Sequence, residues 1–123
     1  MILVDTSVWV EHLRKGTPAL AIALEQGRVL THPFVLGELA CGNLKNRGEV
    51  LRLLRELPAA PTAMDAEALD FIERRALMGR GIGYIDVHLL ASVVLAGSAR
   101  LWTRDRRLAA VAEDLELAHA EQE

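Results

Sequence analysis

The chain has 123 residues, of which 51% are hydrophobic and 25% are charged, and its net charge is −3. This length suits one domain spanning residues 1–123, and the composition is that of a globular protein, which excludes a disordered chain. The mild negative charge argues against non-specific DNA coating, but it leaves room for an enzyme that acts on RNA with metal ions offsetting the phosphate charge.

The number of cysteines and the absence of targeting signals in the sequence exclude further classes of protein. The only cysteine, Cys41, excludes an intramolecular disulfide and a zinc cluster of thiolates. Asp5 interrupts the apolar N-terminal run and no basic leader precedes it, so no signal peptide is expected. The longest apolar stretch, residues 89–97, is shorter than the roughly 20 residues of a membrane-spanning helix. We therefore expect a soluble, cytoplasmic protein without membrane contact.

Short apolar segments alternate with helical patterns along the chain. In chain order, the patterns predict a strand at residues 2–4, helices at 7–14 and 19–26, a strand at 29–31, helices at 32–43, 47–57, 65–77 and 84–96, a strand at 101–103 and a helix at 105–112. Further short strands are expected between Pro58 and Pro61 and at residues 115–118. Strands that alternate with helices in a short chain indicate an α/β fold, a three-layer α/β/α sandwich around a short parallel sheet.

Two acidic residues follow predicted strands. Asp5 comes directly after the first strand and Asp105 lies just beyond the third, and open parallel sheets place their ligands at the carboxyl ends of strands. Each acid has a structural alternative, because aspartate serves well in turns and as a helix N-cap; for Asp105 taken alone we prefer the cap. The hydroxyls of Thr6 and Ser7 are expected to cap the helix that follows Asp5, and Asp65 to cap the helix at 65–77.

Two further acids lie on apolar faces of predicted helices. Glu38 has only uncharged neighbours one turn before and after it, so its carboxylate is expected to point into apolar surroundings, where an unpaired charge is costly. Asp86 repeats this pattern in the most hydrophobic helix of the chain. The alternatives are a Glu38 side chain that reaches solvent or pairs with an arginine, and an Asp86 that complements the helix dipole.

The four acids together favour a metal site. Carboxylates gathered at one point repel one another unless cations lie between them, and ligands that are all oxygen suit Mg²⁺ or Mn²⁺. Such an ion lowers the pKa of a bound water and stabilises charge at phosphorus, which is the chemistry of phosphodiester hydrolysis. Ser7 and Thr103 are placed to orient the ligands or waters of this site.

Four segments carry a resemblance to a known family. They are ILVDTSVW with Asp5, the helix with Glu38, GIGYIDVHLLA with Asp86, and LWTRD with Asp105. In this order, and over nearly the whole chain, they resemble PIN-domain proteins, above all the VapC-like toxins of bacterial toxin–antitoxin pairs; DTSVW and TRD are the most specific parts. Many relatives carry a further acid and an aromatic residue after the last acid, whereas Arg106 follows Asp105 here.

The resemblance implies an Mg²⁺- or Mn²⁺-dependent endoribonuclease with a PIN-like fold, inhibited by a small cognate antitoxin and commonly a homodimer. It implies that Asp5, Glu38, Asp86 and Asp105 are the catalytic metal-site residues, with Thr103 as a supporting hydroxyl. Asp5 and Asp86 would hold the main ion directly. Glu38 and Asp105 would complete its coordination, bind through water or position a second ion.

The remaining hypotheses concern arginines that could contact RNA and the places of His88 and the tryptophans. Arg80, Arg104 and Arg106 are candidates to bind RNA phosphates, because a guanidinium can bind a phosphate through two hydrogen bonds; for each one alone, a solvated surface arginine is the alternative. His88, Trp9 and Trp102 are expected to lie in the core or at a dimer interface. The rival function is a non-catalytic RNA- or protein-binding module with the same fold, which metal-dependent cleavage would distinguish from a nuclease.

Overall fold

Three short parallel strands form the centre of the computed structural model, which describes residues 1–120. The strands are β1 (Ile2–Val4), β2 (Val29–Leu30) and β3 (Arg100–Trp102), in the order β2-β1-β3. Leu3 of β1 lies opposite Leu30 on one side and Leu101 on the other. The central position of β1 explains why all three of its residues are buried and apolar, as in other parallel sheets that helices cover on both faces.

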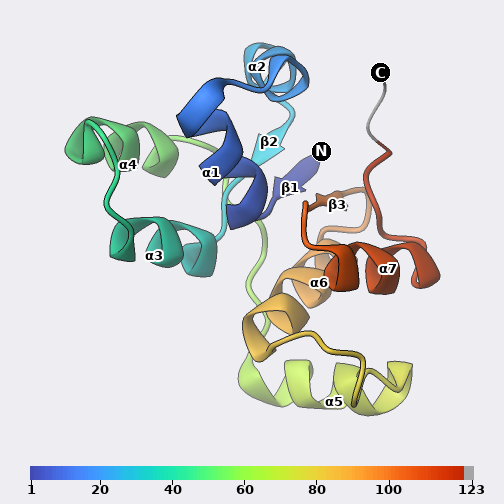
Figure 1. Cartoon of the computed structure of the whole chain (residues 1–123). Helices are drawn as coiled ribbons and strands as arrows, with labels where there is room; N and C mark the ends of the chain where they lie inside the picture. Colours follow the sequence, from blue (N-terminus) through green and yellow to red (C-terminus); the bar gives the residue numbers. More distant parts are fainter. Residues whose placement is uncertain (121–123) are drawn as a thin grey trace.

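Seven helices in the described part of the chain surround this sheet (Figure 1). They are α1 (Thr6–Lys15), α2 (Pro18–Glu25), α3 (Pro33–Cys41), α4 (Arg47–Arg55), α5 (Asp65–Arg75), α6 (Tyr84–Ala96) and α7 (Arg106–Asp114). The expected α/β/α sandwich around a short parallel sheet is confirmed. No helix within residues 1–120 combines the length and the apolar character needed to cross a membrane.

The two additional strands predicted at the sheet edges are each reduced to a single bridge. Thr31 pairs with Ala59, and Leu101 pairs with Ala118, both in parallel orientation. Pro58 limits the first of these edges because proline has no N–H for the ladder; its carbonyl accepts a hydrogen bond from the N–H of Thr31 at 2.8 Å. The bridges extend the sheet without adding full strands.

The helix boundaries follow the residues that start and stop helices. Gly16 ends α1 and Gly97 ends α6, with φ angles of 82° and 81° that favour glycine. The caps predicted for α1 and α5 are wrong. Asp5 stands at the N-cap of α1, whereas Thr6 and Ser7 lie inside the helix and donate to carboxylates. Met64 stands at the N-cap of α5, so Asp65 is the first helical residue there.

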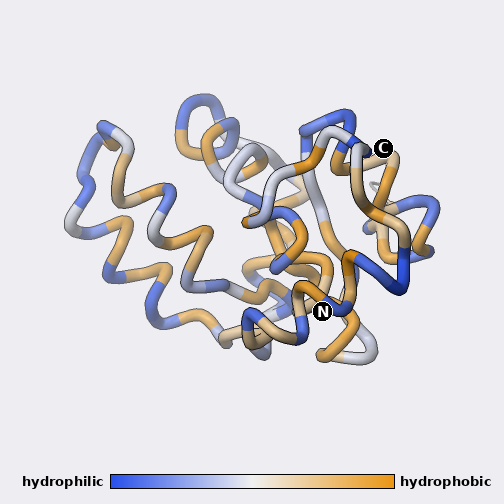
Figure 2. Tube along the Cα trace, turned by 90° about the horizontal axis from the view of Figure 1, so that it is seen from below, coloured by the Kyte–Doolittle hydropathy of each residue, from blue (hydrophilic) through white to orange (hydrophobic). Residues whose placement is uncertain are grey.

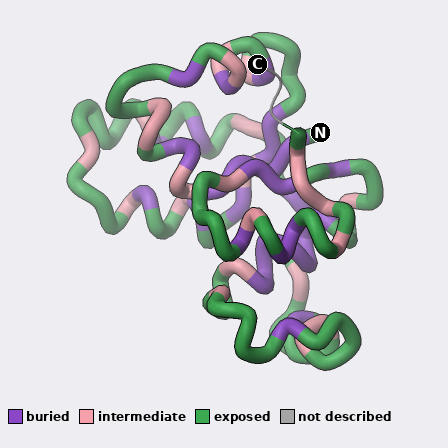
Figure 3. The backbone as a smooth tube through the Cα atoms, turned by 45° about the vertical axis from the view of Figure 1, so that its right-hand side comes forward, coloured by how far each residue is buried: buried purple, intermediate pink, exposed green. Residues whose placement is uncertain are grey.

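The core lies between the sheet and the helices around it, and all seven helices contribute buried residues to it. Residues 87–93 of α6 are all buried, as an apolar helix covered on all sides requires. Trp9 and Trp102 are each only 3% exposed and His88 is 2% exposed, which confirms them as core residues. Figure 2 shows hydrophobic and hydrophilic positions alternating along the outer helices, and Figure 3 shows the buried positions gathered at the centre.

Candidate functional site

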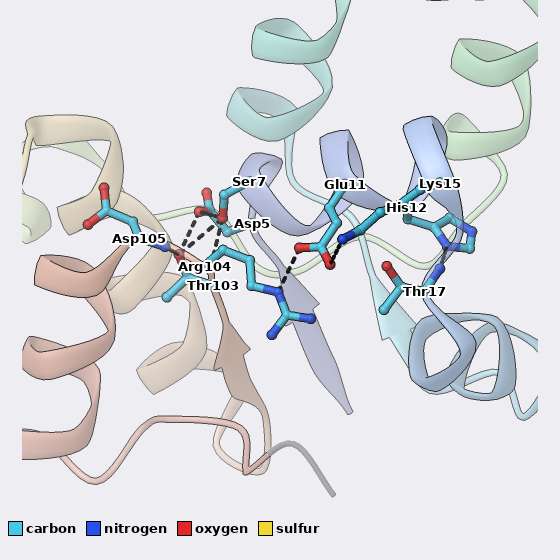
Figure 4. A network of polar contacts seen from close by, with 9 residues as sticks. All are labelled: Asp5, Ser7, Glu11, His12, Lys15, Thr17, Thr103, Arg104 and Asp105. Carbon is cyan, nitrogen blue, oxygen red and sulfur yellow. Dashed lines mark hydrogen bonds and ion pairs between the residues drawn. The ribbon is translucent and has the colours of Figure 1, made fainter. Parts of the chain in front are cut away.

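Asp5 is the buried anchor of the site, at the carboxyl end of the central strand. Its side chain is 6% exposed, and its Oδ2 accepts hydrogen bonds of 2.7 Å from both Ser7 and Thr103 (Figure 4). The backbone N–H of Arg104 donates to Ser7 Oγ at 2.9 Å, and that of Asp105 donates to Thr103 Oγ1 at 3.0 Å. Each hydroxyl therefore accepts a hydrogen bond from a backbone N–H and donates one to the carboxylate. The first hydrogen bond polarises the hydroxyl and strengthens the second. Ser7 and Thr103 hold Asp5 in position, in line with their expected orienting role.

Glu38 comes from α3, the helix that follows β2. Its Oε1 accepts a hydrogen bond of 2.8 Å from Thr6 Oγ1, and the pair is exposed. The expectation that this carboxylate points into apolar surroundings is wrong, because Val35 and Leu39 occupy the buried face of α3. The residues one turn before and after Glu38 are uncharged, as the sequence shows, but the sequence does not show which face of α3 packs against the rest of the protein.

Asp86 lies in the first turn of α6 and is partly buried. Its Oδ2 accepts a hydrogen bond of 3.0 Å from the N–H of Gly83, the residue at the helix N-cap. Burial raises the pKa of Asp86 above its ordinary value, and the negative charges of Asp5, Asp105 and Glu38 raise it further, whereas the Gly83 hydrogen bond lowers it. The four acids thus share one electrostatic environment. The structural alternative also holds, since the carboxylate satisfies a helix N-terminus.

Asp105 is the N-cap of α7. Its Oδ1 accepts hydrogen bonds from the N–H groups of Arg107 at 2.9 Å and Leu108 at 3.1 Å. The cap preferred for this residue is confirmed, and it leaves Oδ2 available. Asp105 is an exposed residue, so this oxygen can reach a ligand without displacing core atoms.

The four carboxylates share one arrangement. Within residues 1–120, the hydrogen bonds to each of them fall on one oxygen, whereas Asp5 Oδ1, Glu38 Oε2, Asp86 Oδ1 and Asp105 Oδ2 accept none. A carboxylate held by one oxygen and open at the other is a preorganised cation ligand. The same residues contain no group of three or more His, Cys, Asp or Glu side chains close enough to form a compact metal cluster. Mg²⁺ commonly keeps several waters and takes only one or two carboxylates directly, so a Mg²⁺ site does not require such a cluster.

The three candidate arginines lie in different settings. Arg104 Nε donates to Glu11 Oε2 at 2.9 Å, and its guanidinium lies 5.7 Å from the Trp102 ring centroid. Arg80 forms an ion pair of 2.6 Å with Asp114 of α7. Arg106 is exposed in the first turn of α7, beside Asp105. Arg104 and Arg106 flank Asp105 in the sequence, whereas Arg80 is held at the other end of α7 by Asp114.

Two contributors to the site were missed in the sequence. Thr6 was expected to cap α1, and its link to Glu38 spans 32 positions, so no local pattern could have indicated it. Glu11 holds Arg104 and lies 3.7 Å from Lys15 (Figure 4). Glu11 lies one helical turn after Ser7, so the face that it shares with the site could have been inferred.

Comparison with known proteins places the chain in a family. The family model described as PIN domain matches residues 2–114. The chain belongs to the PIN-domain family, as the four segments in the sequence suggested.

A particular relative lies close to it. Ribonuclease VapC32 of Mycobacterium tuberculosis is 48% identical to the chain over 122 residues, which are 99% of this chain and 98% of the relative, and the figures are the same for the strains CDC 1551 / Oshkosh and ATCC 25618 / H37Rv. The likeness therefore covers every element that carries the four acids.

Proposed function

We propose that this protein is a metal-dependent endoribonuclease that acts as the toxin of a type II toxin–antitoxin pair in the cytoplasm. The observation that carries the proposal is the shared arrangement of Asp5, Glu38, Asp86 and Asp105, each held by protein donors at one oxygen and open at the other. The near full-length likeness to a protein named a ribonuclease supports RNA as the substrate.

The residues have distinct roles in this proposal. Asp5 and Asp86 hold the main Mg²⁺ or Mn²⁺ ion directly, and Glu38 and Asp105 bind directly or through water. When bound, the ion makes a water nucleophilic at neutral pH and stabilises negative charge on the scissile phosphate. Ser7 and Thr103 fix the position of the Asp5 carboxylate by donating to its Oδ2.

Basic side chains complete the RNA site. Arg80, Arg104 and Arg106 contact backbone phosphates near Asp105. The ion pairs of Arg80 with Asp114 and of Arg104 with Glu11 hold two of these guanidinium groups in place. The side chain of Arg106 makes no ion pair or hydrogen bond within residues 1–120, so it can bind phosphate without breaking a contact.

The proposal includes a small antitoxin and a homodimer as partners. Val10 and Leu13 of α1 are 48% and 38% exposed, although both are large and apolar. With Val50 of α4 they line a groove of about 540 Å³ that also contains Arg14 and Lys45. This lining suits a partner segment that carries apolar side chains and acids.

Cleavage of labelled RNA by wild type and by Asp5→Asn tests the proposal. The variant keeps the shape of the side chain but removes its charge, so we expect cleavage to fall by about 100-fold or more, because metal-ion catalysis contributes several kcal/mol. Circular dichroism checks the fold. Asp70→Asn, which changes an exposed aspartate of α5 that pairs with Arg74, is the matched control and should cleave normally.

Two outcomes would contradict the proposal. A folded Asp5→Asn variant that cleaves as fast as wild type would remove the acids from the mechanism. Wild-type protein that binds RNA but does not cleave it with Mg²⁺ or Mn²⁺ would favour the non-catalytic binding module. Calorimetric titration of Mn²⁺ into wild type and Asp86→Asn separates a missing metal site from an unsuitable RNA.

A further inference from the structure

Thr6 occupies an unusual position between two of the four acids. It follows Asp5 in the sequence and opens α1, and its hydroxyl donates to Glu38 Oε1 at 2.8 Å. Within residues 1–120, this is the single hydrogen bond that the Glu38 carboxylate receives. The junction between β1 and α1 therefore carries Asp5 itself, and it also carries Thr6, which holds Glu38 by a hydrogen bond.

Glu38 needs such a contact more than the other acids do. Asp5 has two hydroxyl donors and is buried, Asp86 bonds to Gly83, and Asp105 bonds to two N–H groups of its own helix. Glu38 is exposed and has a longer side chain with more rotatable bonds. Without Thr6 it would sample several rotamers, and ordering it on a cation would cost conformational entropy.

The type of residue at position 6 suits this task. Threonine is branched at Cβ, so its χ1 angle is restricted within a helix and its hydroxyl points in few directions. The hydroxyl is neutral, so it orients the carboxylate without cancelling the charge that a cation needs. A lysine or arginine here would compete with the cation for Glu38.

We propose that Thr6 is a positioning residue for the metal site, which it serves by holding Glu38 in the rotamer that directs Oε2 toward the cation. This inference rests on the proposed function, because it assumes that the four acids bind a divalent ion. Thr6 does not touch the ion or the RNA; it acts only through Glu38.

A double-mutant cycle on Mn²⁺ affinity, measured by calorimetry, tests this assignment. Thr6→Val removes the hydroxyl at constant shape and should weaken binding by about 10-fold, the lower range for loss of a residue that orients a ligand. Thr6→Ser restores the donor and should recover most of the affinity. In a Glu38→Gln background, Thr6→Val should have no further effect, because the side chain through which it acts no longer carries the charge.

Thr17→Val is the matched control. It makes the same substitution at a buried threonine whose Oγ1 has no hydrogen-bond partner within residues 1–120, and it should leave Mn²⁺ affinity unchanged. The inference is overturned if Thr6→Val binds Mn²⁺ like wild type, or if it weakens binding equally with and without the Glu38 charge.

A second measurement without metal separates this inference from the proposed function. Three-bond NMR couplings about χ1 of Glu38 should report one rotamer in the wild-type protein and averaging in Thr6→Val. Wild-type protein that binds no Mn²⁺ would overturn the metal-dependent function and with it the role of Thr6. If the ion binds but the couplings are the same in both proteins, only the role of Thr6 is overturned.

Discussion

At the scale of single residues, the site is organised by how each negative charge is compensated. Asp5 is the most buried acid, yet two hydroxyls that themselves accept backbone N–H groups support its charge. Asp86 receives one backbone N–H and faces the charges of the other three acids. Asp86 therefore carries a partly buried charge with one hydrogen bond and three acids nearby, and this arrangement weakens the metal-free fold.

Asp86→Asn should stabilise the metal-free protein at neutral pH. Burial and the neighbouring acids raise the pKa of Asp86 in the folded state above its value in the unfolded chain. The folded protein therefore holds the Asp86 proton more tightly than the unfolded chain does. It loses stability as the pH rises from the unfolded pKa through the folded pKa. Asparagine keeps an oxygen for the N–H of Gly83 and removes the charge. Because solvent screens part of this repulsion, we expect a gain of only about 0.5–1 kcal/mol, or a few degrees in Tm, measured by thermal unfolding in the presence of a chelator.

The pH dependence provides the control for this effect. At a pH below the ordinary value of 3.8, Asp86 is protonated in both states, so the difference between wild type and variant should vanish. A variant that is less stable than wild type at neutral pH, or a gain that persists in acid, would contradict the electrostatic explanation.

At the scale of secondary-structure elements, the sequence predicted what local chemistry determines. The bounds of α6 are as predicted because Gly83 and Gly97 mark both of its ends, and β1 follows from three apolar residues before an acid. Asp5 and Asp105 were placed at strand ends by the same logic. Helical periodicity, however, shows only which residues share a face; the exposure of Glu38 and its bond to Thr6 depend on how α3 packs against α1.

The junction of α3 with α6 shows a second long-range contact that sequence could not reveal. His32 is 1% exposed at the N-cap of α3; its Nδ1 accepts from the N–H of Phe34 at 3.0 Å, and its Nε2 lies 3.1 Å from Ser92 Oγ of α6. Because Nδ1 is an acceptor, the proton is on Nε2, which donates to Ser92. The contact thus requires a neutral ring.

Acid should weaken this junction and the fold with it. Burial, and the nearby His88, lower the pKa of His32 from 6.5 to about 4, so the unfolded chain takes up a proton that the folded chain rejects. The stability contributed by His32 is complete above pH 6.5 and falls as the pH drops toward 4, by roughly 3 kcal/mol at most. Urea unfolding of wild type and His32→Asn across this range measures it, since asparagine retains the N-cap acceptor.

Wild type and His32→Asn should differ in stability at neutral pH and become alike in acid. His32→Asn should be less stable than wild type near pH 7, because the bond to Ser92 is lost, and the two proteins should converge toward pH 4 as the histidine is protonated. A stability difference that stays constant across this range would mean that His32 does not titrate there.

At the scale of the whole molecule, the positive charge that binds RNA must be concentrated in one region of the surface. The net charge is −3, and the acidic site adds to the repulsion of phosphate, so steering cannot come from the overall field. Arg104 and Arg106 lie on either side of Asp105 in the sequence, and α7 lies on the opposite side of the molecule from α4 (Figure 1). Basic residues near α7 should therefore affect RNA binding, whereas exposed arginines of α4 should not.

Arg106→Gln tests this asymmetry in an Asp5→Asn background, where RNA binding can be measured without cleavage. Loss of one phosphate contact should weaken binding of a single-stranded oligonucleotide a few-fold and reduce the slope of log K against log salt by about 0.7. Arg55→Gln in α4, which removes the same charge at an exposed position remote from Asp105, is the control and should leave the slope unchanged. Equal changes in both variants would show that RNA responds to total charge, and the proposed path beside Asp105 would be wrong.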